Sequence, residues 1–241
     1  MEMEWYGTAV LVIDSDPERR AEIVSILAEA GSEVVDADTE EAGLEAVYQH
    51  KPGLIIIDAS LSEGESLACC RQIRRLTAAP IVILAAAEEN RLIIQALDAG
   101  ADDYLVSPIN ADVLLLRVWA ALRRARQDAV VEPLTFDDGY LRVNLEAREV
   151  AIMGEPVRLT ATEFSLLAYL LIKGGQVCTF EQLLFNVWGP EFKNRSQYVH
   201  VFIWHLRQKL EPDPKDPTYL TSVHSVGYRF QGVAASQNGG R

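Results

Sequence analysis

Short apolar runs alternate with amphipathic stretches along the first half of the chain. The runs lie at residues 9–13, 34–35, 54–57, 81–84 and 104–106. Continuous apolar runs are typical of strands buried on both faces, and the stretches between them place apolar residues at helical spacing. Five strands that alternate with five helices form a parallel sheet with helices on both faces. The first half is therefore predicted to be an α/β domain with a doubly wound, five-stranded parallel sheet.

Helix-capping residues support this pattern. Asp16, followed by Pro17, is suited to begin the first helix, and Gly31 is suited to end it. Thr39 is suited to begin the second helix, and Gly100 follows the fourth. The third and fifth helices are expected at about 67–76 and 111–126.

The second half has a different pattern. Short strands are expected at four places, with Asp-Gly and Met-Gly turns among them: 134–136, 140–143, 150–152 and 157–159. Two capping boxes, Thr160 with Glu163 and Thr179 with Gln182, each open a helix, and the second helix is expected to run to Gly189. Three further elements complete the half: a helix at 196–210 and the two strands of a hairpin at 219–224 and 227–230. This order predicts an α+β domain.

The change of pattern sets the expected domain boundaries. A chain of 241 residues is long enough for two domains. The first is expected at 1–126 and the second at 134–232, with a linker at 127–133 where periodicity is lost. Residues 233–241 are small and polar, so a disordered tail is expected there.

Composition excludes several classes of protein. Hydrophobic residues make up 49% of the chain and charged residues 24%, which argues against wholesale disorder. No apolar run is long enough for a membrane span, and the N-terminal MEMEWYG lacks the basic start and apolar core of a signal peptide. The cysteines Cys69, Cys70 and Cys178 have neither a disulfide framework nor a zinc spacing. A cytoplasmic, non-membrane protein is expected.

Charge is distributed unevenly. Residues 1–131 contain 11 Lys and Arg against 23 Asp and Glu, a net charge of −12, whereas residues 132–241 contain 11 against 12, a net charge of −1. Contact with phosphates dominates the electrostatics of nucleic-acid binding. If the chain binds DNA, the second half is therefore the part that does so.

Candidate chemistry lies at the carboxyl ends of the predicted strands, where function gathers in parallel sheets. Asp14 and Ser15 follow the first strand, Asp58 the third, Ala85 the fourth and Ser107 the fifth. Two neighbouring carboxylates can hold a divalent metal ion or accept a phosphoryl group. The alternative is that such aspartates only cap helices, which fits Asp16 better than Asp14.

Several motifs resemble one known family. The pieces VLVIDSDPERR, LIIIDASLS, PIVILAA and GADDYLVSP resemble the flavodoxin-like receiver domain of bacterial response regulators. The pieces LTATEFSLLAYLL, QLLFNVWG, HLRQKL and VGYRF resemble the winged-helix effector domain of the OmpR/PhoB subfamily, and the likeness covers about residues 8–230. The resemblance implies a two-component, DNA-binding transcription regulator, not an enzyme.

The resemblance also implies roles for individual residues. In the family, a histidine kinase phosphorylates an aspartate after the third strand, and two acids after the first strand hold Mg²⁺. Asp58 matches the phosphoacceptor, Asp14 the first acid and Tyr104 the aromatic switch residue. The chain departs from the family at five other positions: Ser15 for the second acid, Ala85 for a Thr or Ser, Ser107 for a Lys, and Ser62 and Ser66 for a Pro and a Gly.

These departures affect the chemistry directly. A neutral Ser15 weakens Mg²⁺ binding, so Asp14 and Asp58 are weak candidates for metal ligands. Apart from such a weakly bound Mg²⁺, no cofactor is expected. Without a Lys at Ser107, a transferred phosphoryl group lacks its cation, and the remaining Lys51 lies at the opposite end of the sheet. Signalling without phosphorylation is favoured over a conventional phosphorylation switch at Asp58. A histidine kinase is therefore an uncertain partner. A phosphatase of the haloacid-dehalogenase type, with Asp14 as nucleophile and Asp16 as acid, fits less well because Lys51 is badly placed.

Charged residues of the fourth helix, fifth strand and fifth helix suggest a dimer face. In the family this face forms a symmetric homodimer, although mixed charge is also typical of a solvated surface. The candidate residues are Arg91, Asp98, Asp102, Asp103, Arg117 and Arg123. Val113 stands where the family usually has a Glu, so contacts between subunits are expected to be more apolar.

The helix at 196–210 is the candidate DNA reader. Its apolar side, which repeats Val199, Ile203, Leu206 and Leu210, must face the core. The resemblance makes the opposite side a recognition helix for the major groove. The candidate DNA-binding residues are Arg195, Gln197, Tyr198, His200, Val201, Trp204, His205, Arg207 and His224.

Relatives carry more arginines on this surface. The chain has Gln197, Trp204, His205 and His224 at four positions where they usually have Arg, so weaker binding with a shallower salt dependence is expected. Double-stranded DNA remains the preferred partner, and an adaptor that has lost specific DNA contact is the alternative. The family implies that the loop at 189–195 contacts RNA polymerase.

Overall fold

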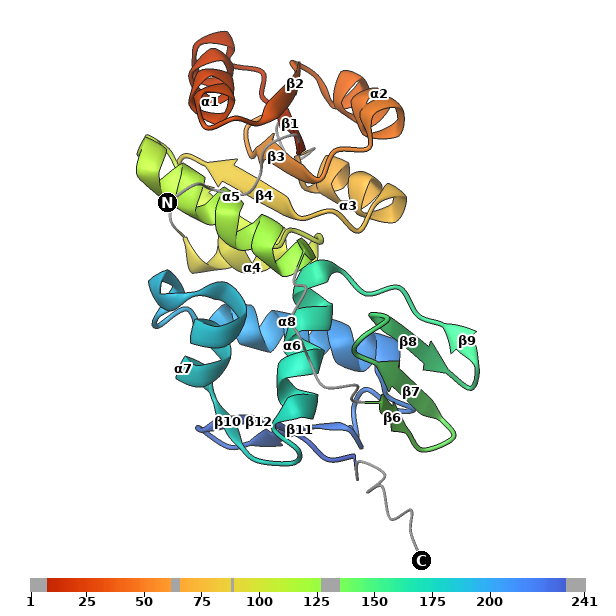
Figure 1. The fold of residues 1–241 in the computed structure, drawn as a ribbon. Coiled ribbons are helices and arrows are strands. Elements are labelled where there is room, and N and C mark those ends of the chain that lie inside the picture. The colour runs from red at the N-terminus through yellow and green to blue at the C-terminus, as the bar shows by residue number, and fades with distance from the viewer. Residues whose placement is uncertain (1–7, 62–65, 88, 127–134, 233–241) are drawn as a thin grey trace, which may run out of the picture. The chain divides into compact units, whose positions relative to one another are not determined.

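The computed structural model describes residues 8–61, 66–87, 89–126 and 135–232 (Figure 1). The chain divides into two compact units, Met1–Arg126 and Gln127–Arg241. The expected linker at 127–133 and the expected tail at 233–241 lie outside the described residues. No helix of the described part is long and apolar enough to cross a membrane.

The first unit is a five-stranded parallel sheet, as predicted. Its strands are β1 (Ala9–Ile13), β2 (Glu33–Ala37), β3 (Leu54–Asp58), β4 (Ile81–Ala85) and β5 (Asp103–Val106). They lie in the order β2-β1-β3-β4-β5, and every adjacent pair is parallel. The central strands β3 and β4 are buried along their whole length, which explains why their sequences do not alternate between apolar and polar residues.

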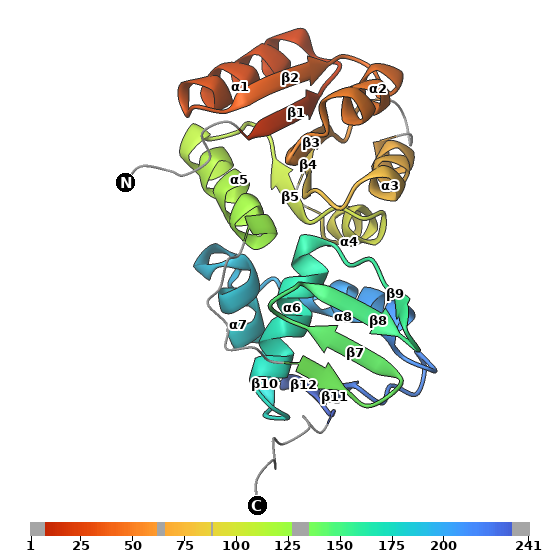
Figure 2. The same cartoon turned by 45° about the vertical axis from the view of Figure 1, so that its right-hand side comes forward.

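Five helices cover the two faces of this sheet. They are α1 (Pro17–Glu29), α2 (Glu40–His50), α3 (Ser66–Leu76), α4 (Asn90–Asp98) and α5 (Ala111–Arg126). Helices α1 and α5 cover one face, and α2, α3 and α4 lie on the other side (Figure 2). Leu27 of α1 and Val118 of α5 pack in one core cluster with Val12 and Ile56 of the sheet.

The expected helix caps are present. The Asp16 side chain accepts hydrogen bonds from the backbone N–H groups of Glu18 and Arg19, at 3.0 and 3.2 Å. The Thr39 side chain accepts one from Ala42 at 3.2 Å. The capping interpretation of Asp16 is therefore confirmed, and Asp14 is left for another role.

The second unit begins with a four-stranded antiparallel sheet. Its strands are β6 (Thr135–Asp137), β7 (Leu141–Asn144), β8 (Glu149–Ile152) and β9 (Glu155–Pro156). The fourth strand was expected at 157–159, and this expectation is wrong. Met153 and Gly154 both have positive φ, at 51° and 89°, and form a two-residue turn, so the returning strand begins directly after them.

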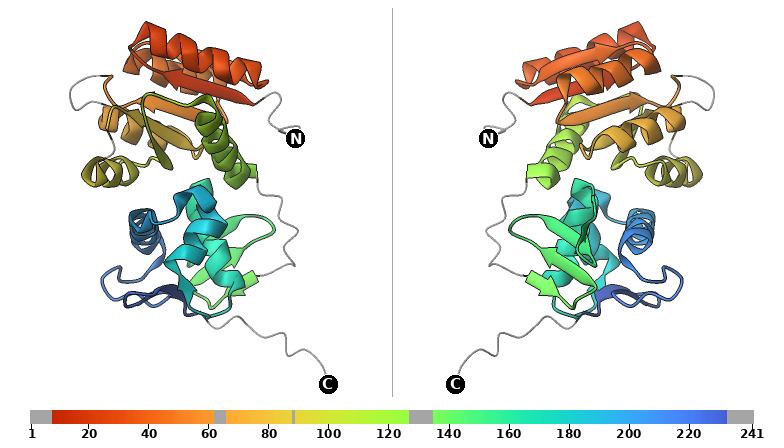
Figure 3. Two further views of the ribbon diagram at one scale, coloured as in Figure 1. Left: turned by 90° about the vertical axis from the view of Figure 1, so that its left-hand side faces the viewer. Right: turned by 90° about the vertical axis from the view of Figure 1, so that its right-hand side faces the viewer.

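Helices and a small sheet complete the second unit. The remaining elements are α6 (Ala161–Ile172), β10 (Cys178–Thr179), α7 (Phe180–Leu183), the π-helical η1 (Leu184–Trp188), the 3₁₀ turn η2 (Pro190–Phe192), α8 (Ser196–Leu210), β11 (Leu220–Val223) and β12 (Gly227–Phe230). Strands β10, β12 and β11 form an antiparallel sheet, and the four-stranded sheet and α8 lie on opposite sides of α6 (Figure 3).

The local signals of this unit are mostly confirmed. Both capping boxes form, at Thr160 with Glu163 and at Thr179 with Gln182. The predicted second helix starts at the expected place but changes from α7 to the π-helical turn η1 at Leu184. The predicted core side of α8 is fully buried; its residues are Val199, Ile203, Leu206 and Leu210.

Candidate functional site

The strand-end residues of the first unit meet at the carboxyl edge of the sheet. Ile13 and Ile57 are register partners, so Asp14 and Asp58, which comes next on β3, lie on adjacent strands. Ala85 ends β4, and its carbonyl accepts a hydrogen bond from the backbone N–H of Ser107 at 2.8 Å. Both carboxylates are buried, with 0% exposure for Asp14 and 2% for Asp58. The expected cluster therefore exists.

A positive side chain reaches into this cluster. Nε of Arg19 lies 2.6 Å from Oδ2 of Asp14, and Nη2 lies 2.8 Å from Oδ1 of the same residue. The same Nη2 also lies 2.7 Å from Oδ2 of Asp58. The prediction that no local cation answers the two carboxylates is therefore wrong. It considered only lysines, whereas α1 starts directly after Asp14 and its first turn carries Arg19 back over the strand end.

The sequence did hold a signal for Arg19. The first turn of a helix favours acidic side chains because the helix dipole is positive there. Arg19 and Arg20 nevertheless lie near the start of that helix, soon after Pro17. This unfavourable placement indicates that acidic groups nearby pair with the two arginines. Arg20 donates to the Asp14 carbonyl at 2.6 Å and to Asp36 at 3.0 Å.

Asp14 and Asp58 differ in their surroundings. Asp14 also accepts the backbone N–H of Asp16 at 2.8 Å on Oδ1, so both of its oxygens have partners. Oδ2 of Asp58 accepts the Ser60 hydroxyl at 2.5 Å in addition to Arg19. Burial raises the pKa of the Asp58 carboxyl and the Asp14 charge adds to this rise, while the Ser60 hydrogen bond and the Arg19 charge oppose it. The hydrogen bond to Asp14 raises the pKa of Arg19, which therefore stays protonated.

The pocket does not fit a magnesium ion. Mg²⁺ requires oxygen ligands in near-octahedral geometry. Ser15 is exposed and neutral, and Arg19 contacts both oxygens of Asp14 and Oδ2 of Asp58. Within the described ranges, no three His, Cys, Asp or Glu side chains are grouped to hold a metal ion.

Of the three switch positions, Tyr104 keeps the family's aromatic residue, whereas Ala85 and Ser107 depart from the family. Tyr104 is 3% exposed, and its hydroxyl donates to the Ala87 carbonyl at 2.7 Å. Ala85 offers no hydroxyl near the pocket, and Ser107, which precedes a cis proline, is half-buried. Of the two other departures, Ser62 and the side chain of Ser66 lie outside the described part of the chain.

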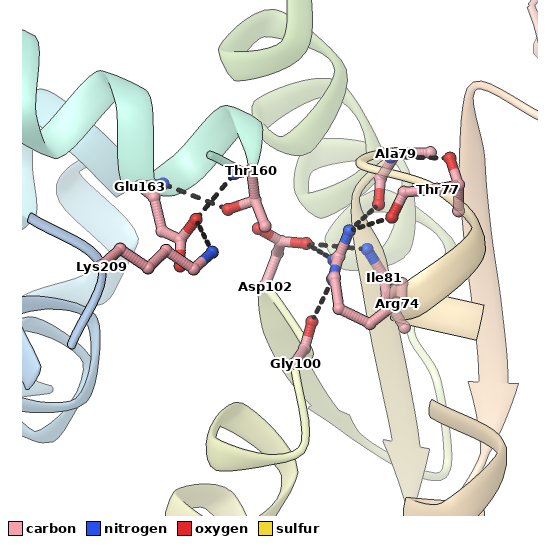
Figure 4. A network of polar contacts seen from close by, with 9 residues as sticks. All are labelled: Arg74, Thr77, Ala79, Ile81, Gly100, Asp102, Thr160, Glu163 and Lys209. Atoms are coloured by element: carbon pink, nitrogen blue, oxygen red, sulfur yellow. Dashed lines mark hydrogen bonds and ion pairs between the residues drawn. The ribbon is translucent and has the colours of Figure 1, made fainter. Parts of the chain in front are cut away.

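Half of the predicted dimer-face charges are used inside the first unit. Asp102 accepts the Arg74 guanidinium at 2.5 Å and the backbone N–H of Ile81 at 3.0 Å (Figure 4). Asp103 pairs with the buried Arg117 at 3.4 Å. These three residues were expected on an exposed surface, and the structure instead buries them, because each charge has an opposite charge as its partner inside the first unit.

The exposed part of this face combines charged and apolar side chains. Arg91 and Asp98 are exposed on α4, and Arg123 stacks on Trp119 of α5 at 5.0 Å from the ring centre. Four large apolar side chains are 38–44% exposed here: Leu92, Ile94, Val113 and Leu116. The expected shift from charged to apolar contacts is consistent with this surface.

In the second unit, α8 presents an aromatic and polar surface. Trp204 is 50% exposed, and its ring centre lies 5.2 Å from that of His205. His200 and His224 are exposed, and Arg195, Gln197 and Val201 are half-buried. Tyr198, expected beside this surface, is fully buried between Trp188 and Phe192 in edge-to-face contacts, so its predicted role in DNA binding is wrong.

Several polar side chains near α8 have partners within the unit. Arg207 donates to the Leu220 carbonyl and to Ser222 of β11, and Nδ1 of His200 lies 2.9 Å from the Tyr228 hydroxyl. Lys209 lies 2.7 Å from Glu163, the acid of the first capping box (Figure 4). The surface is therefore poorer in mobile positive charge than its sequence suggests.

Comparisons with known proteins match both units. Residues 10–119 match the response regulator receiver domain, and residues 154–230 match the C-terminal domain of transcriptional regulatory proteins. The chain is 40% identical to the KDP operon transcriptional regulatory protein KdpE of Escherichia coli K12, over 92% of this chain and 99% of that one. It is 34% identical to KdpE of Mycobacterium tuberculosis H37Rv, over 93% and 99% of the two chains.

Solved structures of other proteins match the chain over both units. The response regulator DrrB of Thermotoga maritima, an OmpR/PhoB homologue, matches with a TM-score of 0.50 and 26% identity over 94% of this chain and 100% of that one. The C128D mutant of RitR matches with a TM-score of 0.75 and 25% identity, over the same shares of the two chains.

Proposed function

Because the chain belongs to the OmpR/PhoB response regulators, a family of two-component DNA-binding transcription regulators, we propose that it binds DNA as a homodimer and does so without phosphorylation of Asp58. The altered receiver pocket is the observation that carries this proposal. Ser15, Ala85 and Ser107 replace three of the groups with which the family handles a phosphoryl group. A histidine kinase is accordingly not a required partner.

The pocket argues against an efficient phosphoryl switch in two ways. The Asp58 oxygen Oδ2 accepts a hydrogen bond from Ser60 and forms an ion pair with Arg19, which makes this oxygen a weaker nucleophile toward phosphorus. The side chain of Ala85 has no hydroxyl to follow a new phosphate, and Tyr104 is already buried with its hydroxyl bonded to Ala87. Phosphorylation of Asp58 would therefore have no side chain at position 85 through which to change the position of Tyr104.

DNA binding is assigned to the exposed side of α8 and the hairpin β11–β12. Gln197 can pair with an adenine edge, Val201 can contact a thymine methyl group, and Trp204 offers a large surface to sugar and bases. Because Arg207 and Lys209 are engaged within the unit, fewer counterions are released on binding. We expect an affinity that is modest and only weakly dependent on salt.

Dimerisation is assigned to α4, β5 and α5. The exposed Leu92, Ile94, Val113 and Leu116 form an apolar surface that a second copy can cover without any phosphate-driven change. A constitutive homodimer follows from this assignment.

Contact with RNA polymerase is assigned to the region around residues 189–195. An apolar pocket lies there, lined by Glu181, Leu184, Phe185, Gly189, Pro190 and Lys193. Phe185 is 58% exposed at its edge, which suits contact with another protein. The regulator would act in the bacterial cytoplasm, where both polymerase and chromosome are found.

The test combines modification with DNA binding. The protein is incubated with acetyl phosphate and Mg²⁺, its intact mass is read, and its affinity for operator duplexes is measured by mobility shift. We expect no stoichiometric phosphorylation, and we expect Asp58→Ala to bind DNA as the wild type does. A gain of one phosphoryl group that depends on Asp58 and tightens DNA binding would overturn the proposal.

A second candidate is a partner-binding adaptor. The half-exposed Trp204 on a surface with few mobile cations favours this alternative, because exposed aromatic residues are frequent at protein interfaces. Binding to every duplex at background level, at all salt concentrations, would support the adaptor.

A further inference from the structure

The guanidinium of Arg19 lies between the two buried carboxylates of the receiver pocket. Its three contacts to Asp14 and Asp58 measure 2.6–2.8 Å. We propose that Arg19 is a built-in cation that takes the place of a divalent metal ion, so that this receiver neither binds Mg²⁺ nor depends on it. This inference deepens the proposed function and rests on it, because it gives the reason why the pocket no longer serves phosphoryl transfer.

The shape of the guanidinium suits this role. One edge of the group, formed by Nε and Nη2, meets both oxygens of Asp14 as a two-pronged pair, at 2.6 and 2.8 Å. Nη2 also lies 2.7 Å from Oδ2 of Asp58, as an ion pair. A single planar cation thus bridges two carboxylates from neighbouring strands, and the point charge of a lysine could not reproduce this geometry.

Burial makes the arrangement strong. The side chains of Asp14 and Asp58 are 0% and 3% exposed, and that of Arg19 is 22% exposed. Two buried carboxylates this close together repel each other unless a cation is present. Arg19 supplies that charge from within the chain, whereas a metal ion would have to come from solution.

A divalent ion would have to displace this group. Both oxygens of Asp14 already accept hydrogen bonds from Arg19, and Oδ2 of Asp58 forms an ion pair with it. Two carboxylates and one guanidinium leave a net charge of only −1 in the pocket, and Ser15 adds no further charge. A doubly charged ion next to a fixed positive charge is disfavoured, and Mg²⁺ also gives up its water reluctantly.

Neighbouring residues fix the geometry. Asp16 begins α1 and holds the backbone N–H of Arg19 at 3.2 Å. Arg20 donates to the Asp14 carbonyl at 2.6 Å and thereby fixes the backbone of the residue that Arg19 binds. The position of Arg19 is therefore fixed by a hydrogen bond of its backbone N–H as well as by the contacts of its side chain.

The experiment is a calorimetric titration of the full chain with MgCl₂, and with MnCl₂ as a second probe. Wild type is expected to show no saturable binding up to about 10 mM metal. Arg19→Gln, which removes the cation and frees the carboxylates, is expected to gain a site at least about ten-fold tighter than any wild-type response, and Asp58→Asn in that background is expected to lose it. Arg142→Gln is the control, because it removes an exposed arginine that pairs with Asp137 in the second unit and leaves the pocket untouched; it should behave as the wild type does.

Thermal unfolding gives an independent reading. Mg²⁺ should leave the melting temperature of the wild type unchanged and raise that of Arg19→Gln, because only a folded state with a metal site is stabilised by the ion. Saturable Mg²⁺ binding to the wild type that Asp58→Asn abolishes would overturn the inference, even if Arg19→Gln failed to fold. The absence of any metal binding by a folded Arg19→Gln would overturn it equally.

The same samples separate this inference from the proposed function. Metal binding by a wild type whose DNA affinity is unaffected by Asp58→Ala would refute the role of Arg19 alone. A metal-free wild type whose DNA affinity falls with Asp58→Ala would refute phosphorylation-independent binding and leave the role of Arg19 intact.

Discussion

Arg207 joins the candidate recognition helix to the closing hairpin, and its replacement by methionine tests whether it supports the fold or contacts DNA. Nε and Nη2 donate to the Leu220 carbonyl at 3.0 and 2.6 Å, and Nη2 also donates to the Ser222 hydroxyl at 2.9 Å. The guanidinium carbon lies 5.6 Å from the centre of the Tyr228 ring. All these partners belong to the hairpin β11–β12, so the side chain acts as a brace.

The size of the effect follows from these contacts. Hydrogen bonds from a charged donor are worth about 1.5–3 kcal/mol each when buried, and a cation–π contact about 0.5–1 kcal/mol. Arg207 is only half-buried, so water replaces part of what is lost. Methionine keeps the apolar stem, and we therefore expect Arg207→Met to lower the free energy of unfolding by about 2 kcal/mol. For a domain of this size, that corresponds to a fall in melting temperature of roughly 10 °C.

Two measurements on one variant distinguish the brace from a phosphate contact. The melting temperature is read by circular dichroism, and the slope of log affinity against log salt is read by mobility shift. A brace predicts a lower melting temperature and an unchanged slope, whereas loss of a phosphate contact would make the slope shallower by about 0.9. Arg142→Met is the control, because Arg142 forms an exposed pair with Asp137 and should change stability by less than about 0.5 kcal/mol. A stable Arg207→Met with a shallower slope would refute the reasoning.

Three further outcomes are expected. Arg74→Met should lower receiver stability by about 3 kcal/mol in urea unfolding, because it removes the ion pair with the buried Asp102 and three hydrogen bonds to backbone carbonyls; a loss below about 1 kcal/mol would contradict this. Trp204→Ala should weaken duplex binding about ten-fold in mobility shifts while leaving the melting temperature nearly unchanged, and unaltered affinity would exclude Trp204 from the interface. Because the pKa of Asp58 is raised in the folded state, the ionised carboxyl costs stability, and this cost grows as pH rises from below the usual aspartate pKa through the raised value. Asp58→Asn should therefore be more stable than the wild type near neutral pH and equal to it in acid, and a gain that appears only in acid would reverse the sign.

Backbone patterns in the sequence were enough to predict most of the fold. The apolar runs that became β1, β3 and β4 required burial on both faces, and only a parallel sheet provides that. The capping boxes at Thr160 and Thr179 marked helix starts through contacts within four residues. Such local signals do not depend on the rest of the chain.

Side-chain partners across the fold were much harder to predict. Arg19 contacts Asp58, 39 positions later, and only the pairing of β1 with β3 makes that contact available. Tyr198 is polar enough at its tip to suit a surface, yet its ring fills the space between Trp188 and Phe192. Asp102 is charged, but Arg74 from α3 is placed to bury it. In each case, tertiary contacts decided what the residue type alone left open.

The pocket and the switch residue together indicate where a signal can enter. Arg19 neutralises one of the two buried charges at the strand ends, and the Tyr104 hydroxyl is bonded to Ala87 without any help from position 85. The carboxylates of the pocket and the hydroxyl of the switch tyrosine thus both have partners within the domain. The conformation of the receiver therefore does not depend on a bound metal ion or phosphoryl group in the proposed mechanism. Under the proposed function, an input would change activity by altering how much of the dimer is present or by binding outside this pocket. Because α4 and α5 expose apolar side chains that a second copy can cover, protein concentration is the simplest such input under the proposed function: the regulator would gain DNA affinity as the dimer forms, with or without phosphoryl donors.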